Sequence, residues 1–150
     1  MESIKKVAVI GVGGVGGYFG GKIAYNNEKN KLGLKVSFVA RGQHYEEIKE
    51  KGLLLKMDKE SLTCNPTEVV NSIKDLESPD LCLVCVKSYH LDKAITELSQ
   101  AIRDDTIIMP FLNGVDVYER VRANTTKGIV LPTCLYVGTH LEKPGVVRQA

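Results

Sequence analysis

Half of the glycines in this chain lie in one short segment that directly follows an apolar run. Seven of the 14 glycines fall between Gly11 and Gly21, immediately after Val7-Ala8-Val9-Ile10. Consecutive apolar residues without polar alternation indicate a strand that is buried on both faces, as in a parallel sheet. The pattern therefore predicts a buried strand, a tight turn and then a helix that packs closely against the sheet.

Short apolar runs alternate with longer amphipathic stretches in the rest of the chain. We expect strands at residues 6–10, 35–40, 81–86, 106–111 and 129–131, and helices at 15–26, 43–51, 69–76, 91–102 and 115–121. Residues 53–56 and 61–64 could form a small hairpin or strand pair. This alternation predicts an α/β fold with a Rossmann-like, doubly wound, mostly parallel sheet and helices on both faces. Ligands of such sheets bind beyond the carboxyl ends of the strands.

The segment Gly11-Val12-Gly13-Gly14-Val15-Gly16 matches the pattern G-x-G-x-x-G and stands between a predicted strand and a predicted helix. In this context the pattern is typical of dinucleotide binding. Gly11 permits the tight turn, Gly13 lets the backbone approach a pyrophosphate, and Gly16 lets the helix pack on the strand. Free amides at the helix start would face the phosphates. A glycine-rich turn without a ligand is the alternative. Gly20 and Gly21, further along, are expected to serve close helix–sheet contact instead.

The residue after the second predicted strand bears on the choice of dinucleotide. An NAD site usually has an acidic residue there, which accepts a hydrogen bond from the ribose 2′-hydroxyl. Here the strand ends Phe38-Val39-Ala40, and Arg41 follows without an Asp or Glu. A guanidinium can donate two charge-assisted hydrogen bonds to a 2′-phosphate, which a carboxylate would repel. Arg41 therefore favours NADP(H) over NAD(H), with a solvated arginine at a strand exit as the alternative.

Polar residues also follow two later strands at the same expected edge. Lys87 comes directly after 81–86, and Asn113 comes shortly after 106–111. A lysine can act as a point charge toward a phosphate or carboxylate, and an asparagine offers both donors and an acceptor. By position alone, each could equally be a helix cap or a surface group.

Composition and charge exclude several classes of partner. The 20 Lys and Arg against 18 Asp and Glu leave a net charge of +2, too small for an electrostatic nucleic-acid binder. The longest wholly apolar run, Leu81–Val86, has six residues, whereas a membrane span needs about 20. No segment has the pattern of a secretory signal peptide. We therefore expect a cytoplasmic protein without nucleic-acid or membrane partners.

The cysteines and histidines do not predict a metal site. Cys82 and Cys85 form a C-x-x-C inside a predicted strand, where an offset of three residues sends side chains to opposite faces. They are interpreted as small apolar core residues. His44, His90 and His140 have no metal-ligand spacing and are interpreted as surface or packing residues.

Taken together in order, these features resemble the N-terminal half of the ketopantoate reductase (2-dehydropantoate 2-reductase) family. The resemblance rests on the glycine segment 11–20, Ala40-Arg41, Val86-Lys87-Ser88, Leu112-Asn113-Gly114-Val115, and the later stretch 142–147. It implies NADPH-dependent reduction of 2-dehydropantoate, a small 2-ketoacid, to (R)-pantoate on the route to pantothenate and coenzyme A. Residues 1–150 would form the NADP(H)-binding domain.

The resemblance also implies roles for individual residues. Residues 11–16 would bind the pyrophosphate and Arg41 the 2′-phosphate of the cofactor. Lys87 would contact the cofactor near the active cleft, and Asn113 would contact both the nicotinamide ribose and the substrate. Thr139 falls near a further backbone contact to the cofactor.

The resemblance further implies a C-terminal helical domain, which we expect to lie outside residues 1–150. That domain supplies the catalytic lysine and most substrate-binding asparagines, so no catalytic residue is expected within residues 1–150. We expect the chain to bind NADPH with little or no turnover. Two alternatives remain, an NADP-dependent reductase of another 2-ketoacid or hydroxyacid and a nucleotide-sensing module. The sequence leaves the substrate and the oligomeric state open.

Overall fold

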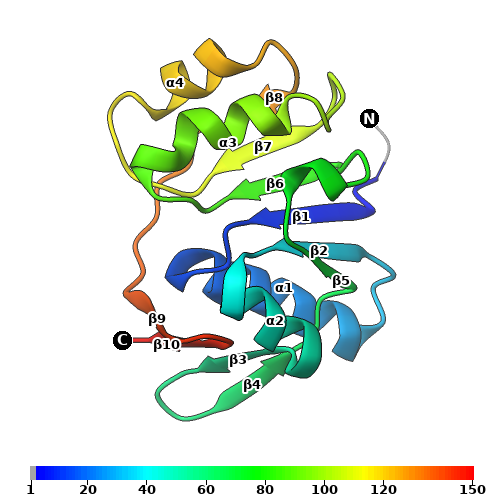
Figure 1. Cartoon of the computed structure of the whole chain (residues 1–150), viewed down its shortest axis with the longest axis vertical. Helices are drawn as coiled ribbons and strands as arrows, with labels where there is room; N and C mark the ends of the chain where they lie inside the picture. Colours follow the sequence, from blue (N-terminus) through cyan, green and yellow to red (C-terminus); the bar gives the residue numbers. More distant parts are fainter. Residues whose placement is uncertain (1–2) are drawn as a thin grey trace.

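Six parallel strands form the main sheet of the computed structural model, which describes residues 3–150 (Figure 1). The strands lie in the order β5-β2-β1-β6-β7-β8, and each neighbouring pair is parallel. Their bounds are β1 Lys6–Ile10, β2 Lys35–Val39, β5 Glu68–Val70, β6 Leu81–Val84, β7 Ile107–Pro110 and β8 Ile129–Val130. This order reverses direction between β1 and β6, which creates the topological switch point where doubly wound sheets bind ligands.

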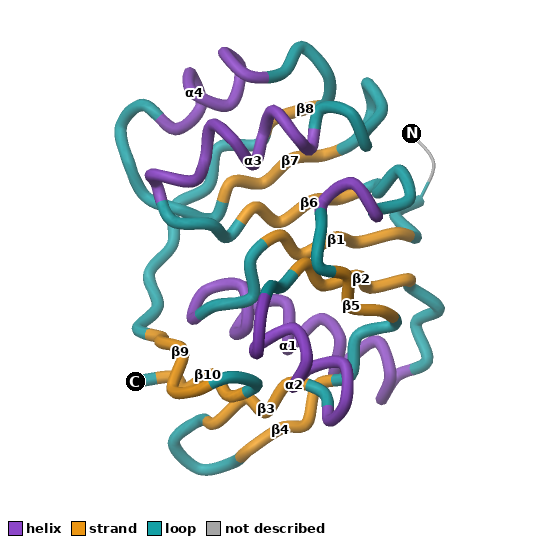
Figure 2. Tube along the Cα trace, viewed as in Figure 1, coloured by secondary structure: helices purple, strands orange, loops and turns teal. Residues whose placement is uncertain are grey.

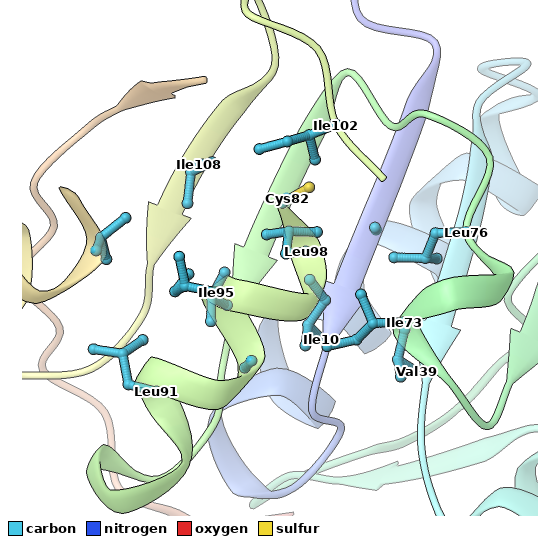
Figure 3. Close-up of a cluster of buried hydrophobic side chains, with 14 of the residues drawn as sticks. Ile10, Val39, Ile73, Leu76, Cys82, Leu91, Ile95, Leu98, Ile102 and Ile108 are labelled. Atoms are coloured by element: carbon cyan, nitrogen blue, oxygen red, sulfur yellow. The ribbon is translucent and has the colours of Figure 1, made fainter. Parts of the chain in front are cut away.

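Helices cover both faces of the main sheet, as the sequence predicts. In the described residues, the α-helices are α1 Gly14–Asn30, α2 Gly42–Lys51, α3 Leu91–Leu98 and α4 Val117–Asn124, and two short 3₁₀ segments are η1 Ile73–Asp75 and η2 Ser88–His90. Helices α3 and α4 and segment η1 bury apolar side chains on one face. Figure 3 shows Leu91, Ile95 and Leu98 of α3 in this cluster beside Ile10 of β1. Helix α1 lies on the opposite face.

A second, smaller sheet lies beyond α1, so this helix is enclosed between two sheets (Figure 2). It contains β3 Leu53–Lys56, β4 Ser61–Cys64, β9 Thr139–Lys143 and β10 Val146–Gln149 in the order β4-β3-β10-β9. The hairpin of β3 and β4 is antiparallel, as expected, and β10 joins it in parallel. Joining residues 53–64 to 139–149 in one sheet was not foreseen from the sequence.

The glycines of α1 allow it to fit between the sheets. A Cβ at Gly20 would lie 2.9 Å from Val9 Cγ1 in the main sheet, and one at Gly21 would lie 3.2 Å from Cys64 Sγ in the small sheet. A Cβ at Gly17 would overlap the side chain of Val147 in β10. The expectation of close helix–sheet contact at Gly20 and Gly21 is therefore confirmed, and it applies to both sheets.

One predicted helix is wrong. Residues 69–76 form edge strand β5 followed by η1, because Val69 and Val70 pair with β2 and Ser37 Oγ donates to the Glu68 carboxylate. β-branched residues favour this extended pairing, and Ser72 Oγ then caps η1 by accepting from the Lys74 amide. The pairing partner is distant in sequence, so local periodicity did not indicate it.

The bounds of other elements differ by a few residues from expectation. Helix α1 continues to Asn30 and ends at Lys31, whose φ of 51° is left-handed. Helix α3 ends at Leu98, although Ala101 and Ile102 still pack on the core beyond it. Pro110 ends β7, where no further ladder donor is needed.

The interpretation of the cysteines is confirmed. Cys82 packs in the cluster beneath α3, and Cys85 packs against the cluster on the face of α1. Burial raises the pKa of each thiol to about 12. Residues 3–150 contain no group of His, Cys, Asp and Glu side chains that could hold a metal ion. Within the same range, no helix is both long and apolar enough to cross a membrane.

Candidate functional site

A pocket of about 560 Å³ opens at the carboxyl ends of β1, β2, β5 and β6, beside the switch point. Its floor is the glycine loop after β1, and its walls come from the end of β2, the segment after β5 and helix α3. The lining residues include Gly11, Val12, Gly13, Ala40, Arg41, His44, Asn71, Ile73, Val86, His90, Lys93, Ala94 and Glu97. Small apolar side chains and a few polar groups share the walls, a combination that suits a planar ring bearing polar substituents.

A second pocket, of about 280 Å³, adjoins the first on the other side of the glycine loop. Both pockets are lined by Gly13 and Val86, so the start of α1 separates two parts of one groove. The second pocket contains Lys87 and Asn113, which come from the ends of β6 and β7. The structure thus brings together Arg41, the glycine loop, Lys87 and Asn113 along one edge of the sheet.

The glycine loop has a geometry that only glycine satisfies at two of its positions. Gly11 has a φ of +87°, and a Cβ there would lie 2.7 Å from the Cys85 carbonyl oxygen. A Cβ at Gly16 would overlap the Gly11 carbonyl oxygen, so the helix is in direct contact with the turn. At Gly13, by contrast, a Cβ would meet nothing within 4 Å. Gly13 therefore borders open space, which is where a ligand could approach the backbone.

The start of α1 presents free hydrogen-bond donors to this space. Among the described residues, no acceptor is bonded to the backbone amides of Gly13, Gly14, Val15 or Gly16, and the first bonded amide is Gly17, which donates to Gly13 O at 2.7 Å. No side chain caps the helix, and its first turn has no acidic residue. Unpaired amides at the positive end of a helix dipole attract anions, phosphates above all.

Arg41 lies at the rim of the first pocket, directly before α2. It is exposed, and within residues 3–150 its guanidinium has no hydrogen-bonded or ion-paired partner, although its backbone carbonyl accepts from the Tyr45 amide. The pocket also contains one carboxylate, Glu97 of α3, on a different wall from Arg41. No acidic residue stands at the end of β2, where an NAD site usually has one.

His44 was interpreted as a surface or packing residue, and this interpretation missed its place in the first pocket. Its Nε2 donates to the Val12 carbonyl, and its Nδ1 accepts from the Gly145 amide at 2.8 Å. Burial lowers the pKa of His44, which favours the neutral ring that these two bonds require. The sequence could have indicated this place. Residues three apart in a helix share a face, and His44 follows Arg41 by three residues at the start of a predicted helix. His90 also lines this pocket, whereas His140 is exposed on β9.

Lys87 and Asn113 differ in how they are held. Lys87 is exposed at the start of η2, and its ammonium has no partner among residues 3–150. The side chain of Asn113 donates from Nδ2 to Leu135 O at 3.1 Å and accepts at Oδ1 from Leu135 N at 3.2 Å. Asn113 therefore anchors the extended segment before β9, while one of its N–H donors remains free.

Thr139 lies at the start of β9 against the first residue of α1. Its carbonyl oxygen and Oγ1 would both lie within 2.9 Å of a Cβ on Gly14. It lines neither pocket, yet its Oγ1 is buried and has no hydrogen-bond partner in the described part of the chain. Buried hydroxyls are almost always paired, so an unpaired one beside free helix amides fits a site that is completed by a bound anionic group.

Comparison with known proteins gives a consistent result. The family model described as "Ketopantoate reductase PanE/ApbA" matches residues 7–150. An "Uncharacterized oxidoreductase YkpB" of Bacillus subtilis (strain 168) is 31% identical over 143 residues, covering 95% of this chain and 45% of that protein. A "2-dehydropantoate 2-reductase" of Pyrococcus horikoshii is 30% identical over 143 residues, covering 95% of this chain and 44% of that protein.

Solved structures agree with the sequence relatives. The crystal structure of 2-dehydropantoate 2-reductase from Porphyromonas gingivalis W83 superposes with a TM-score of 0.90 at 32% identity, over 98% of this chain and 52% of that one. The present chain thus spans about half the length, or slightly less, of the relatives that it matches.

Proposed function

The chain belongs to the ketopantoate reductase family of oxidoreductases, and from this premise we propose that it is the NADP(H)-binding half of a 2-dehydropantoate 2-reductase. The complete reaction would reduce the ketone of 2-dehydropantoate to the hydroxyl of (R)-pantoate, a step toward pantothenate and coenzyme A. Because such a pathway acts on small soluble molecules, a cytoplasmic location is part of this proposal.

One observation supports the cofactor most directly. In the described part of the chain, the backbone amides of Gly13, Gly14 and Val15 and the guanidinium of Arg41 have no partners, and all four residues border the same groove at the switch point. In the proposed complex, the amides of residues 13–16 hold the pyrophosphate, because they are donors already oriented at the positive end of α1. Arg41 holds the 2′-phosphate through its two parallel N–H donors. The free hydroxyl of Thr139 has the position to add a further donor beside Gly14.

In this proposal, the second pocket receives the nicotinamide end of the cofactor. The nicotinamide, when bound, supplies the hydride for the ketone. Lys87 offers a positive charge to the ribose and phosphate side of this pocket, and the free N–H of Asn113 orients ribose or substrate. The ketone oxygen also has to receive a proton. In this proposal, the donor belongs to the part of the family's chain that corresponds to the unmatched half of the relatives.

Nucleotide affinity tests the cofactor assignment. NADPH and NADH dissociation constants are measured by fluorescence titration for residues 1–150 and for Arg41→Asp. We expect the parent to prefer NADPH, and Arg41→Asp to weaken NADPH binding by about tenfold to a hundredfold, since charged hydrogen bonds contribute ~1.5–3 kcal/mol. Lys59→Asp is the matched control, because it makes the same change of charge in the exposed turn between β3 and β4. An unchanged preference in Arg41→Asp ends the assignment to NADP(H).

Turnover tests whether residues 1–150 bind the cofactor without carrying the catalytic groups. We expect residues 1–150 alone to bind NADPH without appreciable ketopantoate-dependent oxidation of it. Rapid oxidation would place the catalytic groups inside this chain and contradict the proposal.

A Bacillus subtilis relative is named only as an oxidoreductase, and its name specifies no substrate. Another 2-ketoacid is therefore the second candidate substrate. NMR titration of the NADPH-saturated chain distinguishes the two. Ketopantoate should shift the Asn113 side-chain amide at lower concentration than pyruvate or 2-ketoisovalerate does, and the reverse order would favour the second substrate.

A further inference from the structure

One peptide group of the glycine loop is held from outside the loop. His44, in the first turn of α2, donates from Nε2 to the Val12 carbonyl and accepts at Nδ1 from the Gly145 amide at 2.8 Å. These partners are 32 and 101 residues away in sequence. Because one ring nitrogen donates and the other accepts, the pair of bonds selects a single neutral tautomer and fixes the plane of the ring.

The bond to Val12 also fixes the direction of the next amide. The peptide between Val12 and Gly13 is trans, so its carbonyl and its N–H point in opposite directions from one plane. With the carbonyl directed at His44, the Gly13 N–H is directed away from it. That N–H has no partner in the described chain, and Gly13 borders both pockets and open space.

The loop needs such an external restraint. Val12 stands between two glycines, which have the widest choice of φ and ψ. The Val12–Gly13 peptide lies before the first hydrogen bond of α1, in which the Gly17 amide donates to Gly13 O. Rotation of the Val12–Gly13 peptide would therefore meet little resistance from the backbone itself. If it rotated, the carbonyl rather than the N–H would face a bound phosphate, and a carbonyl dipole repels an anion.

The other contact of His44 provides a firm anchor. Gly145 is buried in the turn between β9 and β10, with a φ of +81°, and a Cβ there would lie 2.9 Å from Glu47 Cβ on α2. The turn is thus packed against the same helix that carries His44. The imidazole is held between this turn and the glycine loop, and the small sheet thereby supports the loop.

We propose that His44 is a positioning residue for phosphate binding: it holds the Val12–Gly13 peptide so that the Gly13 N–H points at the pyrophosphate of the dinucleotide. This inference rests on the proposed function, and it assigns to His44 no direct contact with the ligand. Its specific consequence is that His44 affects ligands that carry a pyrophosphate and has no effect on ligands that lack one.

Two variants and two ligands test the proposal. His44→Leu fills the same space without a donor, and His44→Gln keeps an N–H donor that can reach the Val12 carbonyl. His140→Leu is the matched control, since His140 is exposed on β9 and lies outside both pockets. NADPH carries both the pyrophosphate and the 2′-phosphate, whereas adenosine 2′-monophosphate carries only the latter. Dissociation constants for both ligands are measured by NMR titration, after circular dichroism has shown that each variant is folded.

We expect His44→Leu to weaken NADPH binding by about tenfold, the effect of one well-placed hydrogen bond to an anion, and to leave adenosine 2′-monophosphate unaffected. His44→Gln should recover most of the NADPH affinity, and His140→Leu should match the parent. Unchanged NADPH affinity in His44→Leu would overturn the proposal, and so would equal losses for both ligands. If His44→Leu fails to fold, His44→Gln becomes the test. Because the glutamine keeps the N–H donor, a tenfold loss of NADPH affinity in His44→Gln would also overturn the proposal. A parent chain that binds neither ligand would instead overturn the proposed function itself.

Discussion

Arg120 of α4 grips Ser88 of η2 with both terminal nitrogens of its guanidinium: Nη1 donates to Ser88 Oγ at 2.8 Å, and Nη2 donates to Ser88 O at 2.5 Å. Ser88 lies between Lys87, which lines the second pocket, and His90, which lines the first. One arginine on a distant helix therefore holds the turn that carries a residue of each pocket.

Removing the two hydrogen bonds from Arg120 to Ser88 should make the turn around η2 more mobile. For Arg120→Ala we expect faster hydrogen exchange over residues 86–92 and NADPH binding weakened by about threefold to tenfold, as the loss of ordered hydrogen bonds implies. The matched control is Arg122→Ala on the same helix, which loses bonds to Lys127 O and Gly128 O but none to η2. Equal exchange at residues 86–92 in both variants would show that Arg120 does not order the turn.

An added methyl group should affect stability at one glycine of the loop and cofactor binding at another. Gly16→Ala should destabilise the fold by more than about 2 kcal/mol, because the Cβ overlaps the Gly11 carbonyl oxygen and forces the backbone to shift. Gly13→Ala should change the free energy of unfolding by no more than about 1 kcal/mol, because its Cβ meets open space. It should nevertheless abolish NADPH binding by filling the approach to the phosphates. Urea denaturation and nucleotide titration measure the two effects, and a Gly13→Ala protein with parental NADPH affinity would contradict the assignment of this space to the ligand.

The half-buried position of His44 predicts a loss of stability in mild acid. Its pKa is lowered from 6.5 by burial, so the unfolded chain takes up this proton more readily than the folded one. The free energy of unfolding should therefore fall as the pH drops below about 6.5, and it should rise again with increasing pH. His44→Gln should remove this part of the pH dependence, as measured by urea denaturation between about pH 7.5 and pH 5. Parallel curves for parent and variant would show that His44 titrates alike in both states.

A second, more acidic transition should come from the small sheet. The Glu142 carboxylate of β9 accepts from Lys56 Nζ at 2.8 Å and from Arg148 Nε at 2.9 Å. These two cations lower the pKa of Glu142 to about 2. Its stabilising contribution is fully present above about pH 4.5 and is lost as the pH falls through about 2. Glu142→Gln should therefore lower the melting temperature at neutral pH and flatten its decline in acid, whereas Glu60→Gln, in the exposed turn between β3 and β4, should leave both unchanged.

Local patterns in the sequence were sufficient for the main sheet and the glycine loop. Apolar runs such as Val7–Ile10 and Leu81–Val84 became buried parallel strands because continuous apolar residues have to be covered on both faces. The spacing of Leu91, Ala94, Ile95 and Leu98 gave one buried face of α3 for a comparable reason. Gly11, Gly13 and Gly16 act within six residues of one another, so their turn could be predicted without knowledge of the rest of the chain.

Contacts between distant segments were decided only by the tertiary structure. Residues 69–70 became a strand because β2 offered an open edge, and residues 139–149 completed the small sheet because β3 offered another. The contacts of His44 with Val12 and Gly145, and of Arg120 with Ser88, also join residues that no local pattern relates. The sequence alone thus predicted which backbone groups lie in the glycine loop at the start of α1, since that depends on neighbouring residues. The fold decided which side chains hold those groups in place, because such bonds form only after packing has brought remote parts of the chain within hydrogen-bonding distance.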